Sequence, residues 1–140
     1  MIAVSRLLAG LALAAAASQP AFAQTDFLKA PKVACSPESV TRCSNGKCTT
    51  KTATAKDKSD ILVIDFAGKK ASVRRGSDAK PFADIVDETL EGENRRFALA
   101  EPGKPNGGDK LSATLTKAGR LLLAISTDGS KAEAVCTVES

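Results

Sequence analysis

Four cysteines are the residues of this chain whose type and spacing most readily support covalent chemistry. Cys43 and Cys48 have four residues between them, which differs from the Cys-x-x-Cys of disulfide oxidoreductases. This spacing and the even count predict structural disulfides and no free thiol. Asn45-Gly46 between them predicts a two-residue hairpin turn that sets Cys43 opposite Cys48. We therefore favour Cys43–Cys48 together with Cys35–Cys136. In the alternative, Cys35 pairs with Cys43 or Cys48, and the other of these joins Cys136.

The chain contains no histidine. Histidine is the usual general base near neutral pH and the commonest transition-metal ligand. If the cysteines are oxidised, no thiolate remains for nucleophilic attack or for zinc. We therefore expect no enzymatic activity, no metal site and no cofactor.

Charged residues occur in two kinds of cluster. The basic ones are adjacent pairs, and since neighbouring residues of a strand point to opposite faces, each pair exposes at most one charge on one side. The acidic ones lack the spacing of a calcium loop. We interpret both as solvated surface rather than as sites. The pairs are Lys69-Lys70, Arg74-Arg75 and Arg95-Arg96, and the acidic residues are Asp84, Asp87, Glu88, Glu91 and Glu93.

Residues 1–23 have the pattern of a secretory signal peptide. Arg6 precedes an apolar run from Leu7 to Ala17, and Ala21-Phe22-Ala23 supplies small residues for cleavage before Gln24. The run is 11 residues long, too short to span a bilayer core of roughly 30 Å. No cysteine lies at the cleavage point, so we expect neither a membrane span nor a lipid anchor. The pattern predicts a periplasmic or secreted protein, an oxidising location suited to disulfides.

The expected mature chain has 117 residues, enough for one domain. Its net charge is +3, because the signal peptide removes one of 20 basic residues and none of 16 acidic ones. That charge is ordinary for a soluble domain, and no aromatic residues are interleaved with the basic pairs to stack bases, so the sequence does not indicate nucleic-acid binding. We expect a flexible N-terminal lead-in at residues 24–34 and a single β domain at 35–140.

Alternating apolar and polar residues, separated by glycine-bearing turns, recur along the domain. Such a pattern predicts an all-β fold, a small antiparallel barrel or sandwich of hairpins stapled by disulfides. Residues 82–91 fit it less well. Phe82, Ile85, Val86 and Leu90 could form a helical stripe, so an α+β fold with one short helix there is the alternative, although we favour a strand. The alternating segments are residues 62–66, 71–74, 111–116, 121–125 and 132–139.

Residues 101–109 form a proline- and glycine-rich loop between two of these strands. We expect it to be mobile, and its Lys104, Pro105 and Asn106 are candidate partner-binding residues, since binding residues often lie on loops. Together these features predict a non-enzymatic secreted or periplasmic domain that binds a protein or a cell-envelope component. The alternative is a carrier that holds a small apolar ligand inside a β-barrel.

Overall fold

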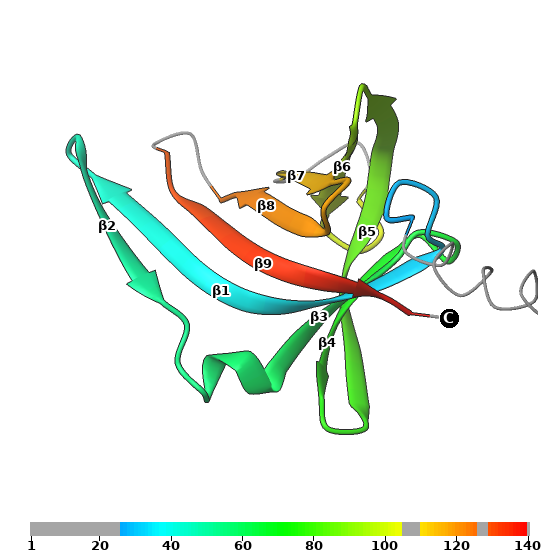
Figure 1. Ribbon diagram of the computed structural model, residues 1–140, viewed down its shortest axis with the longest axis horizontal. Coiled ribbons are helices and arrows are strands. Elements are labelled where there is room, and N and C mark those ends of the chain that lie inside the picture. The colour runs from blue at the N-terminus through cyan, green and yellow to red at the C-terminus, as the bar shows by residue number, and fades with distance from the viewer. Residues whose placement is uncertain (1–25, 105–109, 126–128, 140) are drawn as a thin grey trace, which may run out of the picture.

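The computed structural model describes residues 26–104, 110–125 and 129–139. Nine strands and one 3-10 turn, η2 (Asp57–Ser59), lie in this part of the chain (Figure 1). The strands are β1 (Lys32–Ser44), β2 (Lys47–Thr52), β3 (Asp60–Asp65), β4 (Lys70–Arg75), β5 (Asp78–Glu91), β6 (Asn94–Ala100), β7 (Lys110–Thr116), β8 (Arg120–Ala124) and β9 (Lys131–Val138).

Strands β3 to β9 follow one another as antiparallel neighbours, and β1 closes the sheet by pairing with both β3 and β9. The described strands therefore form a closed eight-stranded antiparallel barrel to which β2 is added as an extra strand. This confirms the predicted all-β fold and selects the barrel over the sandwich. Closure pairs every strand of the barrel on both sides and so removes its open edges.

Residues 82–91 are part of β5, so the strand favoured from the sequence is confirmed and the α+β alternative is wrong. Two irregularities explain their poor alternation. The β5–β6 register shifts between Val86 and Thr89, where Asp87 has a φ of 55°. The β4–β5 register shifts between Ala71 and Ser72 of β4, which lie opposite Ala83 and Pro81 of β5. A bulge inserts a residue into one strand and thereby reverses which side chains face inward.

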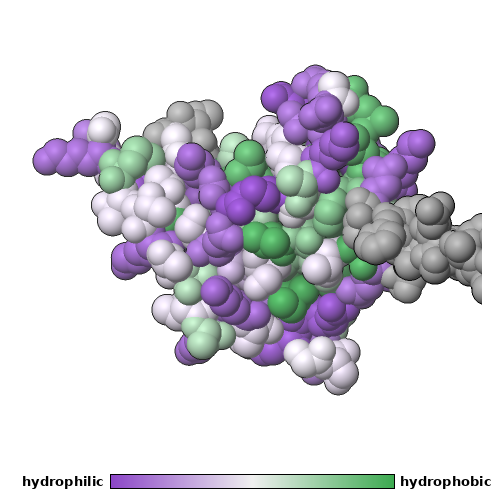
Figure 2. Space-filling model, viewed as in Figure 1, coloured by the Kyte–Doolittle hydropathy of each residue, from purple (hydrophilic) through white to green (hydrophobic). Residues whose placement is uncertain are grey.

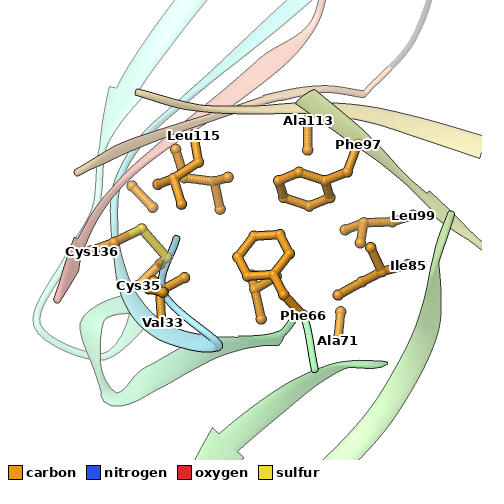
Figure 3. Packing of buried hydrophobic residues seen from close by; sticks show 14 of the residues in the cluster. Val33, Cys35, Phe66, Ala71, Ile85, Phe97, Leu99, Ala113, Leu115 and Cys136 are labelled. Carbon is orange, nitrogen blue, oxygen red and sulfur yellow. A yellow bond between two sulfur atoms is a disulfide. The ribbon is translucent and has the colours of Figure 1, made fainter. Parts of the chain in front are cut away.

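The barrel is filled by side chains from every strand that encloses it. Figure 3 shows the rings of Phe66 and Phe97 at the centre. Their centroids are 5.1 Å apart, and the rings meet edge to face. Aliphatic side chains surround them, and the Cys35–Cys136 disulfide lies at one side (Figure 3). The largest completely buried side chains are those of Ile64, Leu115, Leu121, Val33 and Cys35.

Residues 26–31, just before β1, cover one end of the barrel, so the expected flexible lead-in needs correction for the part that the structure describes. Ala30 is buried, β1 begins at Lys32, and the side chain of Val33 is completely buried. The ring of Phe27 packs so closely on Gly119 that a Cβ at that glycine would lie 2.5 Å from it. The folded domain therefore begins before residue 35, because hydrophobic residues of the lead-in complete the core.

Candidate binding site on the β1–β2 arm

The β1–β2 hairpin projects from the barrel wall as an arm, defined here as Ser39–Thr52 (Figure 1). Its residues Ser39–Thr41 still pair with β9, and beyond them the arm has only two strands. Lys32–Cys35 of β1 pair with β3, whereas Ser39–Ser44 pair with β2 on the same side. The β1–β9 register shifts between Pro37 and Ser39. One strand thus serves first as barrel wall and then as the base of a projecting hairpin.

The arm is held in shape at its tip and at its base. Asn45 and Gly46 both have positive φ, 52° and 78°, as a type I′ turn requires, and Cys43 is bonded to Cys48 behind the turn. The Cys43 N–H also donates to Ser130 Oγ at 2.9 Å, which ties the arm to the segment before β9. Pairing with β9 ends at Thr41. Two strands alone are marginally stable in water, so these constraints compensate for the little burial toward the tip of the arm.

Both disulfides follow the pairing favoured from the hairpin register. Cys43 lies opposite Cys48 in the β1–β2 ladder, and Cys35 lies opposite Cys136 in the β1–β9 ladder. The prediction of no free thiol is confirmed for the four cysteines. Cys35–Cys136 joins the first and last strands of the barrel across its closing seam.

The inner face of the arm is the strongest candidate for a binding site. Alternation from the buried Ala134 places Ala132, and its partner Val40, on the same side of the sheet as the barrel interior. Arg42 follows two residues after Val40 on this face. A groove of about 480 Å³ lies here, and its lining residues are Val40, Arg42, Cys43, Ser44, Lys47, Thr49 and Lys51.

The inner face carries positive charge without compensation. Arg42, Lys47 and Lys51 line the groove, and no acidic residue occurs between positions 39 and 52. Among the described residues none of these three cations makes an ion pair, whereas the basic residues of the barrel wall are mostly paired. Figure 2 shows hydrophilic, neutral and weakly hydrophobic side chains on the arm, with the most hydrophobic ones over the barrel. The groove can therefore attract an anionic group.

The sequence-based interpretation did not single out these three cations. The signal that could have found them is the run from Ser39 to Lys56, which contains basic and hydroxyl residues but no carboxylate. The hairpin register places the three on one face, but the bulge before Ser39 hid that this face lies on the side of the barrel interior, because it shifts the alternation of β1 by one residue.

Of the six basic-pair residues, Arg95 is the one whose interpretation as solvated surface is wrong. Its side chain is only 8% exposed and lies with its guanidinium carbon 3.4 Å from the centroid of the Phe66 ring. It donates to the carbonyls of Ala30 at 2.7 Å and Phe27 at 3.2 Å, and to Glu88 Oε1 at 3.0 Å. Alternation with Phe97 and Leu99 indicated this inward direction. Arg95 thus fixes the N-terminal segment over the end of the barrel.

The other basic pairs and the acidic cluster form separate ion pairs on the wall. Lys70 Nζ lies 2.5 Å from Asp84 Oδ1, and the Gly103 N–H donates to Asp84 Oδ2 at 3.0 Å. These two donors, Lys70 first, hold the pKa of Asp84 below its ordinary value. The remaining acidic residues pair in the same way: Asp87 with Lys110, Glu88 with Arg95 and Lys69, Glu91 with Arg96 and Glu93 with Lys117.

The predicted partner-binding loop is only partly described. Lys104 is exposed, and its Nζ lies 3.4 Å from Glu101 Oε2. Pro105 and Asn106 lie outside the described residues. Its mobility and its role in partner binding stay predictions.

No group of side chains in the described residues is arranged to hold a metal ion. The described residues also contain no helix long and apolar enough to cross a membrane. No known protein-family model matches the chain, and no curated protein matches its sequence. The candidate site therefore rests on its own geometry and charge.

Proposed function

We propose that the protein is a non-enzymatic binding domain of the periplasm or the extracellular space, and that it recognises an anionic group on a protein or envelope component. The observation that carries the proposal is the groove in which Arg42, Lys47 and Lys51 gather with no acidic neighbour. Three like charges held on one rigid face repel one another, and an anion relieves that repulsion.

The two disulfides support the location, because such bonds persist in oxidising compartments. The carrier alternative has less support. Phe66 and Phe97 meet at the barrel centre, where a carrier would hold its ligand. The candidate site lies instead on an exposed arm, which suits a macromolecular partner better than a small apolar molecule.

Charge reversal of the groove tests the proposal. The triple variant Arg42→Glu, Lys47→Glu and Lys51→Glu should bind a poly-glutamate peptide and anionic phospholipid vesicles at least about tenfold more weakly, which corresponds to roughly 1.4 kcal/mol. Binding is measured at low salt, since exposed charges are screened beyond about 8 Å at physiological ionic strength.

The matched control reverses Lys29, Lys56 and Lys58, which lie outside the groove and make no ion pair among the described residues. It changes the net charge by the same amount and should retain most of the binding. Equal losses in both variants would mean that net charge, not the groove, attracts the anion, and would contradict the assignment.

A further inference from the structure

Strand β2 leaves one edge of the described sheet unpaired. It is bonded to β1 on one side, nothing in the described sheet pairs with its other side, and all six of its residues are exposed. A free edge offers a row of backbone donors and acceptors, and extended peptides bind to such edges by adding a strand.

The hairpin register identifies the backbone groups on this edge. Ser44 and Lys47 flank the two-residue turn and therefore exchange hydrogen bonds with each other. Hydrogen-bonded and non-bonded pairs alternate along an antiparallel ladder. Thr50 opposite Thr41 is then a non-bonded pair, so the Thr50 N–H and C=O point away from β1. The same holds for Cys48 and Thr52.

The side chains of β2 divide between two faces in the complementary way. One set faces the groove and consists of Lys47, Thr49 and Lys51, with Arg42 of β1 directly opposite Thr49. The other set faces the opposite side of the hairpin and consists of Cys48, Thr50 and Thr52. An added strand would place every second side chain over the groove. Acidic side chains at those positions would meet Lys47 and Lys51, and the intervening side chains would lie beside threonines.

We propose that the free edge of β2 binds an extended acidic segment of a partner protein as an added strand, with acidic side chains at alternate positions lying over Lys47 and Lys51. The inference rests on the proposed function and names its partner class.

The charges on β2 also disfavour pairing of this edge with a second copy of β2. A second copy of β2 would bring lysines next to lysines, and lysine on an edge strand is a known protection against self-pairing. The same lysines favour an acidic strand, so the edge is selective rather than merely blocked. Because the Cys43–Cys48 bond and the Ser130 contact already order the arm, a peptide would bind to an edge that needs little rearrangement.

One pair of substitutions separates strand addition from simple charge attraction. Thr50→Pro removes an N–H from the free edge but no hydrogen bond to β1, and proline is tolerated at such positions. Thr50→Ala is the matched control, because both variants lose the 2.8 Å contact of Thr50 Oγ1 with Thr41 Oγ1. A fluorescent peptide of alternating Glu and Thr, about as long as β2, should bind Thr50→Pro roughly tenfold more weakly than Thr50→Ala.

Two modified peptides test the same point on the unchanged protein, in case Thr50→Pro disturbs folding. One is N-methylated at every Thr and the other at every Glu, and both keep the full charge. Only one set of these N–H groups can face β2, so one peptide should bind roughly tenfold more weakly than the other. Hydrogen exchange should slow at the amides of Cys48, Thr50 and Thr52 when the unmodified peptide binds.

Equal binding of the two methylated peptides, or equal binding by Thr50→Pro and Thr50→Ala, overturns strand addition. If the groove charge-reversal variant nevertheless loses binding to poly-glutamate or to anionic vesicles, anion recognition stands and only its mode is wrong. If charge reversal has no effect on either probe, the proposed function fails as well.

Discussion

Arg95 makes the contacts on which the covered end of the barrel depends. One guanidinium lies on the Phe66 ring, bonds two backbone carbonyls of the N-terminal segment and pairs with Glu88. Glu88 Oε2 is buried and has no hydrogen-bond partner in the part of the chain that the structure describes, although Lys69 Nζ lies 3.7 Å away. Removal of the cation would leave carbonyls and a carboxylate without their main partner.

We expect Arg95→Leu to lower the free energy of unfolding by about 3 kcal/mol, because breaking one partner of a buried pair leaves the other uncompensated. Urea denaturation measures the effect. The control, Arg96→Leu, alters the outward neighbour, whose side chain is 56% exposed, and should change stability by less than about 0.5 kcal/mol. Similar effects in both variants would show that Arg95 does not hold this end of the barrel.

The lowered pKa of Asp84 makes a second prediction at the residue scale. Lys70 and the Gly103 N–H stabilise the charged form, so the folded pKa lies below the unfolded one. The stability it contributes is therefore present above the ordinary carboxyl pKa of about 4 and is lost as pH falls through the folded pKa.

Denaturation between about pH 5 and pH 2 should show a shallower acid decline for Asp84→Asn than for the unchanged protein. Lys70→Met removes the donor that lowers the pKa of Asp84 most, so it should also make the loss of stability at acid pH shallower. An unaltered acid decline in Asp84→Asn would contradict this assignment.

At the scale of elements, the two disulfides cross-link very different lengths of chain. Cys35–Cys136 has a sequence separation of 101, and Cys43–Cys48 has a separation of 5. In the chain-entropy model, stabilisation increases with the length of the closed loop. The first bond therefore secures the closing seam of the barrel, and the second acts locally on the arm.

We expect replacement of Cys35 and Cys136 by Ala to lower the free energy of unfolding by roughly 4–5 kcal/mol, and replacement of Cys43 and Cys48 by roughly 2 kcal/mol. Thermal and urea denaturation give the comparison. The second pair should also speed hydrogen exchange on the arm while the barrel amides remain protected. A larger loss from the arm disulfide would contradict its local role.

At the scale of the whole molecule, the closed wall leaves recognition to the parts that project from it. The β1–β2 arm projects furthest in Figure 1, and its cations form no ion pair with any described residue, while most charges on the wall are paired. Electrostatic attraction and a free strand edge thus occur together on one element, so we expect the partner to bind there.

The exported protein should begin at Gln24 and contain no reactive thiol. Intact-mass spectrometry of protein from the extracytoplasmic fraction, with and without an alkylating reagent, checks both statements. A mass that retains residues 1–23, or alkylation of the unreduced protein, would contradict the expected export or the oxidised state.

Local patterns in the sequence determined much of this protein. Period-two alternation predicted the strands, since side chains on a pleated strand alternate between core and solvent, and Asn45-Gly46 predicted the Cys43–Cys48 register, since few residues tolerate positive φ. These features depend on neighbours along the chain and are therefore readable from it.

Only the tertiary structure decided the rest. Closure of the barrel depends on β1 meeting β9, a pairing of segments about a hundred residues apart that no local pattern specifies. Burial of Arg95 required the Phe66 ring and the lead-in to converge on one end. The bulge before Ser39 turned the face of the arm that carries Arg42, Lys47 and Lys51 to the same side as the barrel interior, because one extra residue reverses the alternation that follows it.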